Sequence, residues 1–308
     1  MDGFMNILKV PGMTSHDVVL QARKRFPGTK VGHGGTLDPA AAGVLPLMLG
    51  KATRLSSWVI GKEKQYRAEL VLGVTTDTDD LAGTVLKQST PPAISEAELE
   101  RLLQSFQGEL LQVPPMYSAI KHRGKKMYQY AREGKEIERK ERTVTVYDLR
   151  LVAFFPPDRV LFEVSCSRGT YIRTLCRDMG EALGCGASMS YLLRTRVGPF
   201  HLAEALSLEE IAPHPLAHLL PLDYIFQGED KLVLPVEELT LLCHGQKLLL
   251  HETKDAPSRV FPLPVDGKTL PVYTTEGEFV ALARWEKISQ GADSRFALTP
   301  ERVFRLLQ

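Results

Sequence analysis

Apolar and polar residues alternate along several segments of the chain, with the period of two that marks a half-buried strand. Residues 65–74 alternate in this way, and one face of the predicted strand is formed by Tyr66, Ala68, Leu70, Leu72 and Val74. Residues 143–154 and 159–167 also alternate, and a short segment with Pro156-Pro157 separates them. These last two segments are predicted to form a hairpin-like pair of strands.

In other segments the apolar residues recur at the spacing of a helix. Thr14 and Ser95 each have an acidic residue three positions later, which predicts a capping box and a helix after each of them, the second running to Phe106. The first of these helices has its apolar stripe at Val18, Val19, Ala22 and Phe26. A third helix is predicted between a Thr170 cap and Gly184, with an apolar stripe of Ile172, Leu175, Met179 and Leu183.

Strand patterns follow one another more often than they alternate with helices, and no Gly-x-Gly-x-x-Gly motif follows a strand. This order favours an α+β domain built on a largely antiparallel sheet. After residue 228 the chain has short strand-like pieces separated by Gly, Asp and Pro, which is typical of a small β-barrel or sandwich. We expect one domain over 1–228 and a smaller one over 229–308, with the boundary near Gly228.

The composition is ordinary for a soluble globular protein, with 44% hydrophobic and 24% charged residues among 308. No apolar run reaches the roughly 20 residues that span a bilayer, and the N-terminus lacks a signal-peptide pattern, so we expect a cytoplasmic protein. The cysteines show no paired spacing and are predicted to be buried thiols. His214 and His218 are four residues apart, but Pro213 and Pro215 argue against a helix that presents both, so we predict no metal site there.

The net charge of +1 hides a basic segment. Residues 121–142 contain nine Lys/Arg and four Glu, a local charge of 9 − 4 = +5. One interpretation is a solvated helical face with i,i+4 pairs such as Glu138 with Arg142. The other is a surface that binds a nucleic-acid strand, because the cations are interleaved with Tyr117, Tyr128 and Tyr130.

A glycine-rich loop leads to Asp38-Pro39. The simplest interpretation is a helix start, with Asp38 as the N-cap and Pro39 at the first helical position. However, Gly43 and Pro46 would cut that helix to barely two turns. Positive φ angles, or the close approach of another molecule's backbone, are permitted by Gly32, Gly34 and Gly35. A carboxylate fixed before proline in such a loop suits nucleophilic or acid–base chemistry.

Residues 32–54, GHGGTLDPAAAGVLPLMLGKATR, resemble the signature of TruB-type tRNA pseudouridine synthases, which carry G-H-x-G-x-L-D-P followed by G-x-L-P. Further motifs of that family are similar to KVPGMTSHD (9–17, with one departure from the family pattern), Lys64-Gln65-Tyr66 and LGVTTDTDDLAG (72–83). Two longer blocks also match, QVPPMYSAIKHRGKKMYQYAREG (112–134) and CSRGTYIRTLCRDMGEALGCGA (166–187). The resemblance therefore extends through the predicted first domain.

The C-terminal residues are similar to a PUA RNA-binding module, in His244-Gly245-Gln246 and in the segments VYTTEGEFVALARWE and LTPERVF. The resemblance implies a pseudouridine synthase fold over 1–228, with a basic thumb insertion at about 113–142, and a PUA domain over 229–308. It implies an isomerase that breaks the N1 glycosidic bond of uridine 55 in the TΨC loop of tRNA and rejoins the base through C5. No cofactor, metal, membrane or obligate protein partner is implied, and a monomer is expected.

The resemblance also implies roles for three catalytic residues. Asp38 matches the essential carboxylate, which either adds to the sugar or removes a sugar proton. Arg173 matches the arginine that pairs with it, although the helical pattern alone would place Arg173 on the exposed side of its helix. Tyr66 matches the tyrosine that stacks under the target base, although its strand pattern alone indicates a core tyrosine.

Substrate-binding residues follow in the same way. His33 matches a histidine that enters the RNA loop when the base is flipped out, and Tyr171 and Asp80 match residues beside the site. Without the resemblance, Tyr171 would be a helix-end packing residue and Asp80 a turn aspartate. The cations expected to bind RNA in the thumb are Lys121, Arg123, Lys125 and Lys126.

Two other functions remain open at the level of sequence. A nucleoside or glycoside hydrolase would use Asp38 with a second carboxylate, for which the candidates are Asp77, Asp79 and Asp80. A non-catalytic RNA-binding or RNA-folding protein would use only the basic segment and the C-terminal module. The reaction product separates the first from an isomerase, and an Asp38→Asn variant separates the second.

Overall fold

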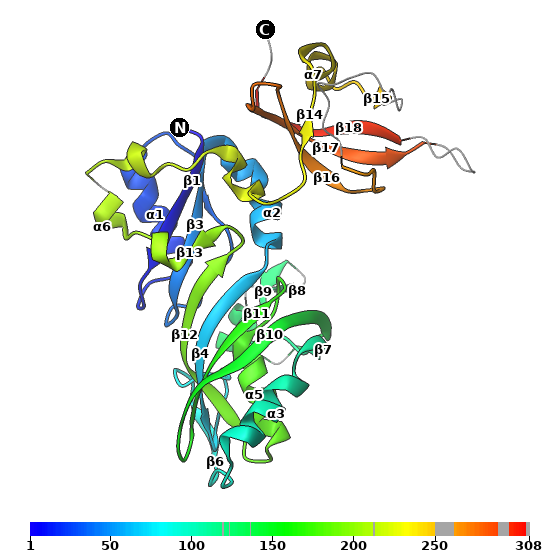
Figure 1. Cartoon of the computed structure of the whole chain (residues 1–308). Helices are drawn as coiled ribbons and strands as arrows, with labels where there is room; N and C mark the ends of the chain where they lie inside the picture. The colour runs from blue at the N-terminus through cyan, green and yellow to red at the C-terminus, as the bar shows by residue number, and fades with distance from the viewer. Residues whose placement is uncertain are drawn as a thin grey trace. The chain divides into compact units, whose positions relative to one another are not determined.

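The computed structural model describes residues 1–118, 120–122, 124–135, 137–211, 213–249, 262–288 and 296–305 (Figure 1). The side chains of Lys121 and Arg132 lie outside this description. The chain divides into two units, Met1–Leu220 and Pro221–Gln308, so the predicted boundary residue Gly228 lies inside the second unit.

One nine-stranded sheet organises the first unit, in the order β1-β3-β12-β4-β11-β10-β7, with β2 paired to β3 and β13 to β12. Every pairing in it is antiparallel except that of β12 with β3, so the predicted α+β fold with a largely antiparallel sheet is confirmed. The strands are β1 (Gly3–Lys9), β2 (Val31–His33), β3 (Ala42–Leu49), β4 (Lys64–Leu72), β7 (Gly108–Gln112), β10 (Arg142–Phe155), β11 (Arg159–Cys166), β12 (Ala187–Val197) and β13 (Phe200–His201).

Three longer helices pack on this sheet: α1 (Ser15–Arg25), α3 (Glu96–Ser105) and α5 (Ile172–Ala182). The capping boxes predicted at Thr14 and Ser95 are both present. α1 packs its apolar stripe on β1 and β3, whereas α3 and α5 share a second core with β4, β10, β11 and β12, as Figure 1 also shows. α5 begins one residue later than predicted: Tyr171 is its N-cap, and the Thr170 hydroxyl donates to the Ser167 carbonyl instead.

Shorter elements fill the connections of the first unit. They are η1 (Gly50–Leu55), α2 (Ser56–Gly61), β5 (Val74–Thr76), β6 (Val85–Gln88), β8 (Lys121–His122), β9 (Lys125–Lys126), α4 (Met127–Arg132), η2 (Leu202–Glu204), α6 (Leu208–Ile211) and η3 (Pro215–His218). In the basic segment the helix covers Met127–Arg132, and residues 137–141 form none. The interpretation of Glu138 and Arg142 as a helical pair is therefore wrong, because Arg142 already begins β10.

The second unit contains a five-stranded sheet in the order β14-β16-β17-β18-β15, whose buried face packs around Trp285 and the apolar side of α7. Its elements are η4 (Leu222–Phe226), β14 (Leu232–Val233), α7 (Val236–Cys243), β15 (Leu248–Leu249), β16 (Thr269–Tyr273), β17 (Phe279–Lys287) and β18 (Phe296–Val303). The predicted small β-rich unit is confirmed. The four cysteines, one of them in this unit, are buried free thiols, as predicted.

Candidate active site

Asp38 lies in the loop between β2 and β3. The turn at Pro39 is closed by a hydrogen bond from the Ala41 N–H to the Asp38 carbonyl, at 3.0 Å, and β3 begins at the next residue. No helix follows Asp38, so its interpretation as a helix cap is wrong. Its side chain is 36% exposed, which leaves the carboxylate accessible from solvent.

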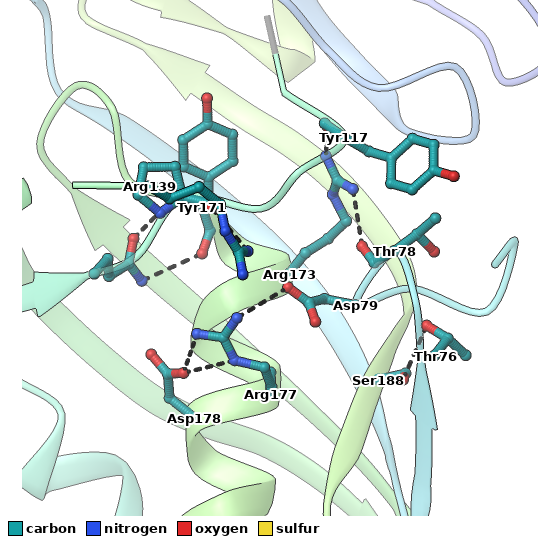
Figure 2. Close-up of polar contacts among 12 residues, drawn as sticks. Thr76, Thr78, Asp79, Tyr117, Arg139, Tyr171, Arg173, Arg177, Asp178 and Ser188 are labelled. Atoms are coloured by element: carbon teal, nitrogen blue, oxygen red, sulfur yellow. Dashed lines mark hydrogen bonds and ion pairs between the residues drawn. The ribbon is translucent and has the colours of Figure 1, made fainter. Parts of the chain in front are cut away.

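Arg173, in the first turn of α5, holds this carboxylate through two nitrogens. Its Nε lies 2.9 Å from Asp38 Oδ2, and its Nη2 lies 3.3 Å from Oδ1. The same guanidinium donates to the carbonyls of Thr78 and Tyr117, each at 2.9 Å (Figure 2). The Arg173 side chain is only 5% exposed, so the alternative of an arginine on the exposed side of the helix is wrong.

Asp80 adds a second carboxylate to this cluster. Its Oδ2 lies 3.5 Å from Arg173 Nη1, while its Oδ1 accepts hydrogen bonds from the Thr78 hydroxyl and the Ala82 N–H. Asp80 is therefore both a turn aspartate and a charge partner of Arg173. Burial raises the pKa of the Asp38 carboxyl above its usual value; Arg173 opposes this shift, and the negative charge of Asp80 adds to it.

Tyr66 belongs to the buried core directly under this loop. It shares a hydrophobic cluster with Leu37 and Ala41, which flank the Asp38-Pro39 turn, and it is 8% exposed. Burial raises the pKa of its phenol to about 12, and the positive charge of Arg194 opposes that shift. Tyr66 is thus a buried core residue, as its strand pattern indicated, and the core around it includes residues that flank Asp38-Pro39.

His33 and Tyr171 border the loop from β2 and from the start of α5. The Nδ1 of His33 accepts the N–H of Gly35 at 3.3 Å, and burial lowers the pKa of the imidazole, which favours the neutral ring. The backbone N–H and carbonyl of Tyr171 both bind the side-chain amide of Gln112. Burial raises the pKa of the Tyr171 phenol.

The predicted thumb cations are described in part. Lys125 forms an ion pair with Glu133 and lies over the ring of Tyr130, 4.8 Å from its centroid. Lys126 lies 5.6 Å from the centroid of Tyr128. Arg123 and the side chain of Lys121 lie outside the described residues.

Glycine is required by the protein's own packing at Gly34 in the loop and at Gly43 near the start of β3. A Cβ at Gly34 would lie 2.3 Å from a methyl group of Val59, and one at Gly43 would lie 2.2 Å from the Arg194 carbonyl. Gly43 also has a φ of 114°, which disfavours other residues. At these two positions the close approach that glycine permits is that of the protein's own chain.

Sequence reasoning missed the buried cations beneath the loop. The Lys9 ammonium donates to the carbonyls of Pro39 and Ala41, at 3.2 and 2.6 Å, and burial lowers its pKa to about 8. Arg194 on β12 is buried against the same loop. Their only signal in the sequence is a cation within or at the end of an apolar strand segment, a pattern that surface strands also show.

Comparisons with known proteins agree with this arrangement. Residues 23–172 match the family model of the TruB family pseudouridylate synthase N-terminal domain, and residues 173–240 match that of the tRNA pseudouridylate synthase B C-terminal domain. The tRNA pseudouridine synthase B of Alkaliphilus oremlandii is 52% identical over 80% of this chain and 83% of its own. The protein of the same name from Moorella thermoacetica is 42% identical over 98% of this chain and 99% of its own.

Solved structures extend the likeness to three dimensions. A chain of a Cbf5-Nop10-Gar1 complex matches with a TM-score of 0.75 and 28% identity, over 98% of this chain and 85% of its own. A chain of an H/ACA RNP bound to a substrate RNA containing 2′-deoxyuridine matches with a TM-score of 0.74 and 26% identity, over the same shares of the two chains. Within the described part of the chain, no helix is long and apolar enough to cross a bilayer.

Proposed function

The chain belongs to the TruB family of pseudouridine synthases, which isomerise uridine to pseudouridine at position 55 in the T loop of tRNA, and from this premise we propose that Asp38 is its catalytic carboxylate. The observation that supports this assignment most strongly is the contact between Asp38 and Arg173. It joins a solvent-accessible carboxylate to a nearly buried guanidinium, and the residues that flank Asp38-Pro39 share a buried cluster with Tyr66.

The reaction is an isomerisation: it needs one carboxylate, and no group or electron is supplied by another molecule. The N1–C1′ bond breaks, the base turns, a C5–C1′ bond forms, the C5 proton leaves and N1 gains a proton. Asp38 either adds to C1′ or removes a sugar proton, and both routes require its ionised form. The two-point contact with Arg173 fixes the plane of the carboxylate, and the raised pKa of Asp38 makes it a stronger base.

The aromatic residues act on the base and on the RNA loop. A target base in folded tRNA must be flipped out at a cost of a few kcal/mol. Tyr66, in the buried cluster that also contains Leu37 and Ala41, supplies a platform for that base, and its hydroxyl assists the departure of the C5 proton. The neutral ring of His33 fills the vacated stack, and Tyr171 and Asp80 line the approach to Arg173.

The substrate is tRNA, and we assign its contacts to two further parts of the chain. The thumb cations, among them Lys125 and Lys126, bind the phosphates of the TΨC stem-loop, and the unit Pro221–Gln308 adds affinity as an RNA-binding module of the PUA type. A monomer in the cytoplasm carries out the reaction, without a cofactor or an obligate protein partner.

Incubation with an unmodified tRNA transcript tests the proposal. We expect pseudouridine at position 55 in an RNA of unchanged mass, and none with Asp38→Asn at full tRNA binding. Release of free uracil would identify a hydrolase instead. If wild type and Asp38→Asn bind tRNA equally and neither forms pseudouridine, the protein is a binding protein.

A further inference from the structure

Arg194 occupies the centre of the first unit's sheet and is almost completely buried, with 1% of its surface exposed. We propose that Arg194 is a positioning residue that sets both the Asp38 loop and the Tyr66 hydroxyl in place for the reaction. The inference rests on the proposed function and assigns a further residue to its site.

Arg194 binds the catalytic loop on both sides of Asp38. Its guanidinium donates to the carbonyls of Gly35 and Thr36, at 3.1 and 3.4 Å, which precede Asp38 in the loop. Its Nε donates to the carbonyl of Val44, at 2.8 Å, which lies in β3 after the loop. One planar group therefore joins the two ends of the segment that carries the catalytic carboxylate.

The backbone of Arg194 is fixed in the same place. β12 and β3 pair in parallel through Arg194 and Gly43, and this close contact leaves no room for a side chain at position 43. β12 also pairs with β4 through Arg194 and Tyr66. The arginine therefore lies between β4, which carries Tyr66, and β3, which follows the catalytic loop.

Tyr66 is the direct cross-strand neighbour of Arg194 on β4. The positive charge of the guanidinium opposes the rise in the phenol's pKa that burial causes. The positions of Asp38 and Tyr66 thus depend on a single side chain, although the two residues come from different elements. A buried guanidinium is costly unless its N–H groups are paired, so these contacts hold it in one orientation.

This geometry predicts a change in rate rather than in binding. Lysine at position 194 keeps the charge, but its single nitrogen cannot take the places of the three guanidinium nitrogens that donate to the carbonyls of Gly35, Thr36 and Val44. The loop and the phenol then shift relative to each other by a fraction of an ångström or more. Such misplacement can cost about 100-fold in rate while leaving the RNA contacts at the surface intact.

The test compares Arg194→Lys with Arg196→Lys in the full-length protein. Arg196 belongs to the same strand, but its guanidinium pairs with Glu63 and not with the catalytic loop. Single-turnover rates at saturating tRNA, tRNA dissociation constants and melting curves are measured for both variants. We expect Arg194→Lys to lose at least about tenfold in rate, equal to about 1.4 kcal/mol of activation free energy, with its dissociation constant within a factor of two of wild type.

A matching rate for the two variants, a raised KM at an unchanged kcat, or a rate loss equal to the unfolded fraction would overturn the inference. Repeating Arg194→Lys on a Tyr66→Phe background tests whether Arg194 acts on the Tyr66 hydroxyl: we expect a smaller further loss there, and an equal loss would remove Tyr66 from the proposal. Failure of the proposed function itself is distinguishable, because wild type and Arg196→Lys would then also make no pseudouridine.

Discussion

Replacement of Arg173 by lysine is the strongest perturbation of the site that keeps its charge. The guanidinium now makes two contacts with Asp38, one with each of the carbonyls of Thr78 and Tyr117, and one with Asp80. These contacts come from three nitrogens in one plane. A lysine ammonium is a single point with three donors, and it cannot replace the two-point contact with Asp38 and also reach both carbonyls.

The structure sets the size of the effect. At least two hydrogen bonds to a charged group are lost at a side chain that is 5% exposed. With a net value of about 1.5 kcal/mol for each, the lower end for charged hydrogen bonds, the free energy of unfolding falls by about 3 kcal/mol. For a unit of this size, that corresponds to a melting temperature lower by roughly 6–12 °C. The carboxylate also loses its fixed plane, which we expect to reduce the rate by about 100-fold.

Release of tritium from tRNA labelled at uridine C5 measures the rate, because the C5 hydrogen leaves when the new bond forms. Rates are taken well below the melting temperature of each variant. Arg177→Lys is the matched control, since Arg177 lies one turn further along α5 and pairs with Asp79 and Asp178 instead of Asp38 (Figure 2). If Arg173→Lys proves as fast as Arg177→Lys, the guanidinium does not orient the catalytic carboxylate.

Four other expectations concern Asp38 and the RNA contacts. Asp38→Asn abolishes pseudouridine formation without lowering the melting temperature, because the raised pKa of Asp38 means that its ionised form disfavours the folded state at neutral pH; a marked loss of stability would contradict this. Asp80→Asn shifts the acidic limb of the pH–rate profile to lower pH, since the charge of Asp80 raises the pKa of Asp38; an upward shift would reverse the assignment. Lys125→Ala with Lys126→Ala flattens the dependence of log affinity on log salt by roughly 0.7–0.9 for each lost phosphate contact, and an unchanged slope would exclude both lysines. A chain ending at Gly228 keeps its turnover at saturating tRNA but shows a higher KM; lost turnover at an unchanged KM would place chemistry in the second unit.

Local rules predicted the helices and strands well where neighbouring residues decide the structure. The capping boxes at Thr14 and Ser95 need only residues three positions apart, and the alternation in β4 needs only period two. The start of α5 differs by one residue from the prediction. A cap at Thr170 would need its hydroxyl oxygen to accept a backbone N–H of the helix, whereas the structure shows the hydroxyl donating to the Ser167 carbonyl. The role that the hydroxyl takes is decided by the loop's conformation, which the sequence pattern does not contain.

The candidate site divides in the same way. The resemblance to the family singled out Asp38 and Arg173, which the chain separates widely and the fold brings to 2.9 Å. The resemblance gave no role to Lys9 or Arg194, because their roles depend on which carbonyls face them. Both partners of an ion pair are charged residues that can be seen in the sequence. A buried cation that binds backbone carbonyls has no such charged partner.

Burial and the negative charge of Asp80 raise the pKa of the Asp38 carboxyl although a guanidinium lies next to it. Arg173 is shared between Asp38 and Asp80, and it also donates to two carbonyls, so its positive charge is not reserved for Asp38. Lys9 and Arg194 donate to backbone carbonyls of the loop and not to the Asp38 carboxylate. The loop is therefore held rigidly by cations while its carboxylate keeps more basicity than an isolated ion pair would leave it. A rigid, basic and solvent-accessible carboxylate is what attack on a sugar carbon or removal of a sugar proton requires.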